Sequence, residues 1–394
     1  MLKTTQSPQP ATTETEPTKI FVSLELSNKE WLVSSKSPGN GSRTSVHSVN
    51  ARDMSMLTAL LGRLQAKARA RTGAEDDYPI VVIYEAGMDG FWIQRSLEQE
   101  GVTCRVVDPA SIPMPRRARQ VKTDRIDGEV LLRCLLSHEL QWPRISSMVH
   151  VPSVKQEDER RICRERERLV NERGQHTSRI KSLLKTVGIA DYQPFRRDRR
   201  KQLDELRTPN GNKLPENMKD EILRELERLE LVAKHIKAVD DKRDALVTAK
   251  IAADEAAARP SPLATLLNLK GIGVQFAFVL WCEGFFRRFD NRGQVASYAG
   301  LTPSPWQSGT IDRVQGVSKS GNPRLRRPLI QLAWLWLRHQ PNSALSLWFN
   351  KRLVDNGGRR KRTLIVALAR KLLVALWQYA TCGLVIEGAV MKRS

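Results

Sequence analysis

The sequence predicts an α/β domain followed by two mainly helical segments. Strand-like and helix-like segments alternate up to about residue 136, and helical periodicities fill much of residues 157–250. Helices rich in Leu, Ala and Trp then close the chain. At 394 residues the chain has room for two or three domains. We expect a disordered tail over residues 1–18, which are rich in Thr, Pro, Gln and Glu, and domains over residues 19–150, 151–260 and 261–394.

The first predicted domain follows the order β-β-β-α-β-α-β-α. A period of two marks the first strand, and a mostly apolar run marks the fourth as a strand buried on both faces. The predicted strands cover residues 20–26, 30–35, 44–49, 78–84 and 102–107. The predicted helices cover residues 53–70, 91–100 and 124–136. This succession resembles the RNase H-like (RuvC-like) fold, a mixed sheet flanked by helices. In that fold, acids converge from the first strand, the end of the fourth strand and a late helix.

The middle of the chain carries apolar residues at heptad spacing. They are Ile162, Leu169, Ile180, Leu183 and Val187, and a second series runs through Ile222, Leu226, Leu229, Ala233 and Ile236. Both series predict helices of a coiled coil, paired with each other or with a second subunit. Ordinary amphipathic helices packed on a neighbouring domain explain the pattern equally well. The second helix, predicted over residues 217–250, would be roughly 50 Å long, and residues 252–262 are predicted to be a linker.

The third predicted segment starts with Leu269-Lys-Gly-Ile-Gly273, followed by the apolar residues 274–280. This pattern resembles the hairpin of a helix-hairpin-helix, in which a Gly-x-Gly turn offers backbone N–H groups to a phosphate. Such turns are common, so the signal is weak by itself.

The composition favours a polyanionic partner in a reducing compartment. Lys and Arg exceed Asp and Glu by 65 to 43, a net charge of +22, which makes nucleic acid the first candidate. No signal-type or uninterrupted bilayer-length apolar run is present, so we expect a cytoplasmic, nucleoid-associated protein rather than a membrane protein. The five cysteines and six histidines are dispersed, which gives no support to disulfides or to a zinc site.

Four carboxylates form the candidate chemical site. Asp124 and Asp127 lie three residues apart and would share one face of a helix, where two negative charges need a cation. By themselves they are explained better as a solvated acidic turn at a helix start. Glu85 ends the fourth predicted strand and Glu25 lies near the end of the first. Glu85 alone could cap the next helix, and Glu25 alone could be an exposed strand residue. Together the four acids could bind two magnesium ions.

Several motifs make a family resemblance specific. They are Phe21–Leu26, Tyr84-Glu-Ala-Gly87, Lys122-Thr-Asp-Arg-Ile-Asp127, Ala299-Gly-Leu-Thr-Pro303, Ser308-Gly309 and Ser318-Lys-Ser-Gly-Asn322. In this order, over most of the chain, they resemble the insertion-sequence one-ten and eleven-eleven family of DEDD transposases. The first acid departs from that pattern, because the family usually has Asp where this chain has Glu25. The extra methylene moves the carboxylate by about one bond length, and magnesium holds its ligand geometry strictly.

The resemblance implies a serine nucleophile that attacks a DNA phosphate and forms a phosphoserine. Ser308 matches that position, with Thr310 where a second Gly is frequent. Such an intermediate keeps the phosphodiester energy for rejoining. Without the resemblance, Ser308 is better explained as a turn residue, and Ser304, Ser318 and Ser320 are rivals. The resemblance also implies a structured guide RNA.

Basic residues flank both candidate segments. Those expected to bind nucleic acid are Lys122, Arg125, Arg313, Lys319, Arg324, Arg326 and Arg327. Further arginines at 116, 117 and 119 precede the acidic helix, and we expect half or more of all these cations to be solvated surface.

The sequence therefore predicts a magnesium-dependent DNA transposase or recombinase that acts on element ends and target DNA as a homo-oligomer, a dimer or tetramer. Two alternatives stay open. One is a nuclease or Holliday-junction resolvase that uses only the four acids and water. The other is a decayed element that binds nucleic acid without catalysis.

Overall fold

The computed structural model describes residues 18–41, 43–113, 124–142, 145–258, 260–308 and 311–392. Within these ranges the side chains of residues 124–125, 306–308 and 311–315 are not described. Most of the predicted tail and the basic residues at 116, 117, 119 and 122 therefore lie outside the described residues. The chain forms two compact units, Met1–Val151 and Pro152–Ser394.

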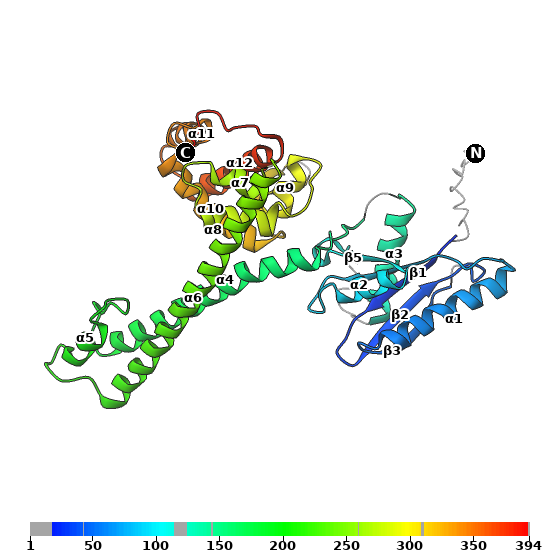
Figure 1. The fold of residues 1–394 in the computed structure, drawn as a ribbon, viewed down its shortest axis with the longest axis horizontal. Coiled ribbons are helices and arrows are strands. Elements are labelled where there is room, and N and C mark those ends of the chain that lie inside the picture. The colour runs from blue at the N-terminus through cyan, green and yellow to red at the C-terminus, as the bar shows by residue number, and fades with distance from the viewer. Residues whose placement is uncertain are drawn as a thin grey trace, which may run out of the picture. The chain divides into compact units, whose positions relative to one another are not determined.

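Unit 1 is built on a five-stranded mixed sheet (Figure 1). Its strands are β1 (Ile20–Glu25), β2 (Glu30–Lys36), β3 (Ser45–Asn50), β4 (Ile80–Glu85) and β5 (Thr103–Val107). They lie in the order β3-β2-β1-β4-β5. The β1–β2 and β2–β3 pairs are antiparallel, whereas β1–β4 and β4–β5 are parallel. The predicted α/β class is confirmed, and every strand lies within two residues of its predicted bounds.

Helices cover both faces of this sheet. Leucines of α1 (Met54–Thr72) and Leu97 of α2 (Trp92–Gln99) pack with the even-numbered residues of β1 and β4 in one core. On the other face, Leu131 and Leu135 of α3 (Asp124–Glu139) pack with the odd-numbered Phe21, Val81 and Ile83. Because alternate strand residues face opposite sides, β1 at the centre of the sheet is buried on both. The period of two in its sequence therefore does not reflect an exposed face.

Unit 2 begins with two long helices that pack against each other. They are α4 (Val154–Thr186) and α6 (Glu216–Ala256) (Figure 1). The short α5 (Arg199–Glu205) lies in the connection between them in the sequence. Leu169 packs with Val232 and Ile236, and residues near the end of α4 pack with the start of α6. A capping box of Ser153 and Gln156 starts α4. The heptad residues thus join two helices of one chain, while coiled-coil packing and pairing with a second subunit stay predictions.

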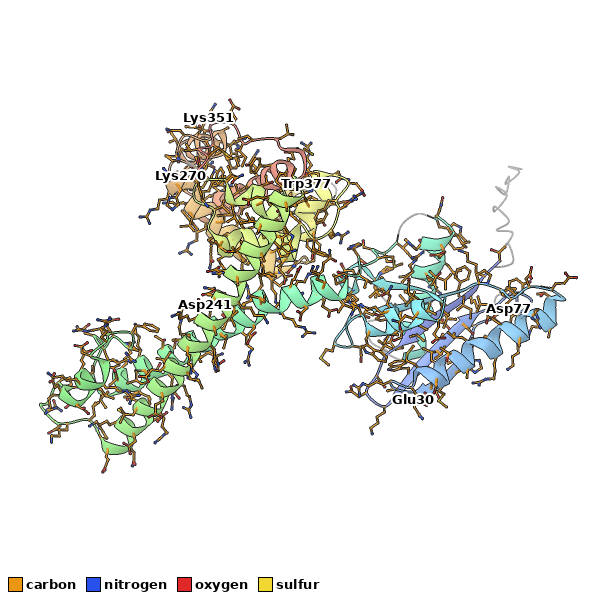
Figure 2. All side chains as sticks on the ribbon, viewed as in Figure 1. Glu30, Asp77, Asp241, Lys270, Lys351 and Trp377 are labelled. Carbon is orange, nitrogen blue, oxygen red and sulfur yellow. The ribbon has the colours of Figure 1, made fainter. Side chains whose placement is uncertain are left out.

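The rest of unit 2 is a helical assembly with one β-hairpin. Its helices are α7 (Pro262–Leu267), α8 (Val274–Val279), the π-helical turn η3 (Leu280–Gly284), α9 (Arg292–Tyr298), α10 (Pro323–His339), α11 (Ala344–Asp355) and α12 (Lys361–Cys382). The hairpin consists of β6 (Pro303–Ser308) and β7 (Ile311–Val317), which the sequence did not predict. Lys270, labelled in Figure 2, lies in the glycine-containing turn between α7 and α8. Two short helices flank this turn, as a helix-hairpin-helix-like start requires, but that motif and phosphate binding by it stay predictions.

Helix α12 is the one described helix whose length and composition would allow it to cross a membrane. Its apolar face nevertheless packs inside the core of unit 2. Leu368, Leu372 and Leu376 are fully buried there, together with Trp336 of α10. Arg370 and Lys371 interrupt the apolar run at its middle. These contacts are those of a core helix.

Candidate functional site

Glu25 and Glu85 are the last residues of two neighbouring strands and lie at the same end of the sheet. Strands β1 and β4 pair in parallel with Leu24 opposite Tyr84, so the residues that follow are adjacent as well. Both glutamates share the odd-numbered face with Phe21, Val81 and Ile83, which is the face that α3 covers. Glu85 is exposed and Glu25 is half-buried. Strand pairing therefore brings these two acids together, although 60 residues separate them in sequence.

The start of α3 lies over the same end of the sheet. The Ser23 hydroxyl, two residues before Glu25, donates a 2.8 Å hydrogen bond to the Gly128 carbonyl. A Cβ added to Gly128 would lie 2.8 Å from the Ser34 Oγ, so any larger residue would force this hydroxyl to move. Asp127 precedes Gly128 and is half-buried. The helix start is thus held against the sheet at the position of the predicted acids.

The opposite end of α3 fixes its direction. Glu139 accepts hydrogen bonds from the Lys19 Nζ at 3.0 Å and the Arg105 Nε at 3.1 Å. Lys19 precedes β1, so α3 runs antiparallel to that strand. Burial would raise the pKa of Glu139, but the hydrogen bonds from Lys19 and Arg105 outweigh it and hold the pKa below its usual value.

The backbone positions of the four predicted acids accordingly lie at one end of the sheet. Asp124 is the first residue of α3, and its side chain is not described. Among the described side chains, no group of three or more His, Cys, Asp or Glu residues lies close enough to hold a metal ion. The backbone arrangement gathers the positions, and the four-acid metal site stays a prediction.

Ser308 is the last residue of β6, at the tip of the hairpin. It pairs with Ile311 of β7, and Gly309 and Thr310 lie outside the described residues. A Gly-containing connection between two strand-like runs is the usual hairpin signal. Pro303 and Pro305 obscured this signal in the sequence, because proline donates no ladder hydrogen bond. Of the rival serines, Ser318 and Ser320 are exposed.

Gly300 and Gly321 allow two backbone segments to pack closely at the base of the hairpin. A Cβ added to Gly321 would overlap the Gly300 nitrogen and the carbonyl oxygens of Ser297 and Tyr298. The Lys319 N–H donates to the Gly300 carbonyl at 3.2 Å, and the Ser318 N–H donates to the Thr302 carbonyl at 2.8 Å. Lys319 itself has a left-handed φ of 59°, which is uncommon outside glycine. The motifs at 299–303 and 318–322 therefore form one folded unit beneath Ser308.

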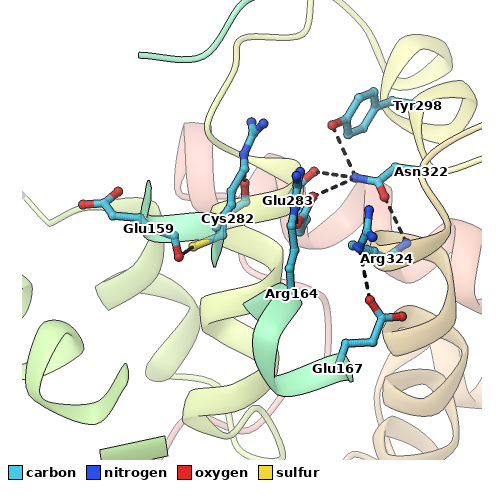
Figure 3. Close-up of polar contacts among 9 residues, drawn as sticks. Glu159, Arg164, Glu167, Cys282, Glu283, Tyr298, Asn322 and Arg324 are labelled. Atoms are coloured by element: carbon cyan, nitrogen blue, oxygen red, sulfur yellow. Dashed lines mark hydrogen bonds and ion pairs between the residues drawn. The ribbon is translucent and has the colours of Figure 1, made fainter. Parts of the chain in front are cut away.

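A buried polar network lies next to this unit (Figure 3). Glu283 of η3 is 1% exposed and accepts hydrogen bonds from the Arg164 Nε at 3.0 Å and the Asn322 Nδ2 at 3.1 Å. Asn322 also caps α10 by accepting from the Arg324 N–H. Burial raises the pKa of Tyr298, whose hydroxyl lies 3.4 Å from the Asn322 Nδ2. Sequence reasoning missed Glu283 and Arg164, since nothing in their local sequence distinguishes them from surface residues.

Comparison with known proteins places this arrangement in a family. A family model described as "Transposase IS116/IS110/IS902 family" matches residues 263–348, which include the hairpin and α10. The protein named "Putative transposase y4rJ" of Sinorhizobium fredii is 57% identical over 377 residues, covering 95% of this chain and 94% of that protein. The chain belongs to the IS110 family of transposases.

Less similar transposases also match over most of the chain. The "Transposase for insertion sequence element IS1111A" of Coxiella burnetii is 25% identical, with 76% of this chain and 77% of the relative covered. The "Transposase for insertion sequence element IS1328" of Yersinia enterocolitica is 23% identical, with 78% and 86% covered. The resemblance inferred from the motifs is thereby confirmed.

The predicted basic residues of this IS110-family transposase differ in their contacts. The Arg326 Nη1 donates to the carbonyls of Ala299 and Lys319 at 3.2 and 3.0 Å, so it stabilises the hairpin base. Arg324 and Arg327 form ion pairs with Glu167 of α4, and Lys319 is exposed. The side chains of Arg125 and Arg313, and the whole of Lys122, lie outside the described residues. Nucleic-acid binding by this set stays a prediction.

Proposed function

We propose that this transposase cuts and rejoins DNA strands through a Ser308 nucleophile and a magnesium site formed by Glu25, Glu85, Asp124 and Asp127. The observation that carries the proposal is the residue-for-residue parallel pairing of β1 and β4. That pairing ends in Glu25 and Glu85, on the sheet face against which Gly128 of α3 is hydrogen-bonded.

The sheet supports an RNase H-like assignment for residues 19–150. Three antiparallel strands are followed by two that join in parallel on the other side of β1, and helices cover both faces. We further propose that residues 151–260 form a coiled-coil and linker domain and that residues 261–394 form the domain that carries the serine.

The donor set fits magnesium. All four side chains offer carboxylate oxygens, which are hard ligands suited to this ion. A divalent cation bound between two carboxylates that end adjacent strands would offset any repulsion between them. When bound, magnesium would neutralise phosphate oxygens and lower the pKa of a hydroxyl beside it. The role of Glu25, Glu85, Asp124 and Asp127 is then to hold the ion at the strand ends.

The proposed reaction is an exchange of phosphodiester bonds. The Ser308 Oγ loses its proton and forms a bond to a DNA phosphorus, and the bond from that phosphorus to a deoxyribose oxygen breaks. The deoxyribose oxygen takes up a proton and leaves as a free hydroxyl. A hydroxyl of a second strand then attacks the phosphoserine and regenerates Ser308. The number of phosphodiester bonds is unchanged, so no nucleotide cofactor is needed.

Further partners follow from charge and from family membership. A net charge of +22 supports binding of DNA and of a structured guide RNA, both read mainly through their backbones. We propose a homo-oligomer of two or four copies that works in the cytoplasm on nucleoid DNA. Such an oligomer allows two arrangements at one phosphate. The acids and the serine belong either to the same copy or to two different copies.

The deciding experiment traps the covalent intermediate. Purified protein is incubated with labelled DNA that carries the element ends, with the flanking element RNA, and with or without magnesium. Denaturing gels then report protein-linked strands. We expect a magnesium-dependent adduct that is lost in Ser308→Ala and kept in Ser320→Ala, a matched control twelve residues away. Strand cutting without any adduct would favour the water-dependent nuclease and overturn the serine mechanism.

A further inference from the structure

An arginine-lined cavity of about 820 Å³ lies between α4 and the start of α10. Its arginines are Arg161, Arg164 and Arg168 on α4 and Arg324 and Arg327 on α10. Three glutamates and one asparagine complete the lining, which leaves an excess of two positive charges. We call this feature the arginine groove. It lies within unit 2.

The spacing of the arginines suits a polyanion. Arg161, Arg164 and Arg168 are three and four residues apart, so they follow one face of α4. At the helical rise they span about 10 Å, which is roughly the axial rise of three base pairs of a DNA duplex. Arg324 and Arg327 repeat the same spacing on the opposite wall.

Four of the five arginine side chains are exposed, although Arg161 pairs with Asp158 at 3.8 Å and Arg324 and Arg327 pair with Glu167. The side chains of Arg161 and Arg327 are 72% and 71% exposed, Arg324 is 47% exposed, and Arg168 is exposed as well. Arg164 differs, because its Nε is bonded to the buried Glu283. Arg164 therefore anchors the groove to the buried polar network of Glu283, and the other four side chains are the ones that a ligand could reach.

One carboxylate bridges the two walls. Glu167 of α4 accepts from the Arg324 Nε at 3.1 Å and lies 3.5 Å from the Arg327 Nη1 (Figure 3 shows the Arg324 contact). Arginine binds carboxylate and phosphate through the same two-pronged geometry. Glu167 thus occupies the position that a phosphate would take, and such a phosphate would compete with it.

We propose that the arginine groove binds the sugar-phosphate backbone of duplex DNA and that Glu167 competes with the DNA for Arg324 and Arg327. None of the described residues that line the groove is aromatic, which disfavours unpaired nucleotides that stack on aromatic rings. The choice of DNA rests on the proposed function, because α10 follows the hairpin of Ser308 after only five residues, 318–322. A duplex held at α10 would be the strand pair that this serine attacks.

The test measures DNA binding by the full-length protein without magnesium. Fluorescence anisotropy with a labelled random-sequence duplex of about 30 base pairs gives the Kd as a function of salt. The groove variants are Arg324→Gln/Arg327→Gln and Arg161→Gln/Arg168→Gln. The matched control is Lys234→Gln/Lys237→Gln, which removes two exposed cations from α6 at the same spacing. Thermal unfolding of each variant verifies the fold.

We expect each groove variant to bind DNA at least about tenfold more weakly and its salt slope to become shallower by roughly 1.8, or 0.9 for each phosphate that is no longer neutralised. The control should retain its affinity within about twofold. Glu167→Gln should bind DNA several-fold more tightly, because its amide competes less well for the guanidinium groups. A groove that was merely structural would give weaker or unchanged binding in Glu167→Gln.

Two further results would overturn the inference. One is DNA affinity that is unchanged in both groove variants. The other is a selective loss of binding to an RNA duplex of matched sequence, which would make the groove an RNA site. Binding is measured without magnesium, so it does not depend on the reaction of Ser308. A groove that binds DNA in a protein that forms no adduct would overturn the proposed reaction alone.

Discussion

The hydroxyl of Ser23 donates a 2.8 Å hydrogen bond to the carbonyl of Gly128, joining the central strand to the first turn of α3 across 105 residues. Since Asp127 precedes Gly128 and Glu25 follows Ser23 by two residues, this bond sets the separation of the helix and strand acids. The packing around Gly128 is tight, so a substitution that adds one methyl group there tests it.

Gly128→Ala is expected to cost about 1–3 kcal/mol of stability through overpacking. The new Cβ would meet the Ser34 Oγ at 2.8 Å, whereas the Ser34 Cβ is 3.5 Å away, an ordinary contact. Ser34→Ala removes the crowding atom, which has no hydrogen-bond partner among the described residues. In that background the cost of Gly128→Ala should fall below about 1 kcal/mol. Chemical denaturation checks this cycle. Gly62→Ala in α1, with open space around it, is the control and should be neutral or stabilising, since alanine favours helices.

Gly321→Ala is expected to destabilise unit 2 by more than about 3 kcal/mol. Its Cβ would overlap backbone atoms of Gly300, Ser297 and Tyr298, which cannot rotate away. Gly174→Ala in α4 meets nothing within 4 Å and should be neutral or stabilising, since alanine favours helices. Thermal unfolding separates the two variants, and equal melting temperatures would contradict the close approach.

Glu139 makes the anchoring of α3 sensitive to acid. Its pKa is lower in the folded protein than in the unfolded chain, because Lys19 and Arg105 donate hydrogen bonds to its carboxylate. Its contribution is therefore fully present above the unfolded pKa and is lost as pH falls through the folded pKa. Hydrogen exchange over residues 124–139 should accelerate below about pH 4.3, the usual pKa of Glu, relative to the rest of unit 1. Glu139→Gln should show faster exchange at neutral pH and a smaller acid response.

A surface pair supplies the control for Glu139. Asp77, labelled in Figure 2, pairs with Arg69, and both side chains are about half exposed. Asp77→Asn is expected to change stability by less than about 1 kcal/mol. Equal effects of the two substitutions would show that the Lys19 and Arg105 contacts of Glu139 do not anchor the helix.

Removal of magnesium or of one acid should abolish strand cutting while DNA binding remains. We expect Glu85→Gln and Asp127→Asn each to lower the magnesium-dependent cutting rate at least about a hundredfold. Glu30→Gln, at the exposed start of β2, should leave it unchanged. Metal titration of cleavage on denaturing gels gives both the rate and the magnesium requirement. Full activity of Glu85→Gln would exclude this acid from the metal site.

Glu25→Asp examines the residue that departs from the family pattern. If Glu25 serves as a ligand, the wild type is active and the shorter side chain changes the magnesium concentration needed for half-maximal cutting. A wild type without activity, combined with cutting by Glu25→Asp, would identify a decayed element. The readout is the same magnesium titration.

The strands and helices of unit 1 could be predicted because their signals are local. Periodicity in residues 20–26 and the apolar run at residues 78–84 determine the strands, and the acids follow at their ends. The role of Ser23 could not be predicted, because its partner lies on α3 far along the chain. The same holds for Glu283 and for the arginine groove, whose walls are separated by about 160 residues and meet only through helix packing.

The pairing of β1 with β4 also limits which length changes this protein can tolerate. Deleting one residue inside either strand would shift its register and turn one of Glu25 and Glu85 to the opposite face of the sheet. Deletions in the exposed connection at residues 74–77 would leave both carboxylates where they are. Natural insertions and deletions among related transposases should therefore gather in such connections and spare the two strands.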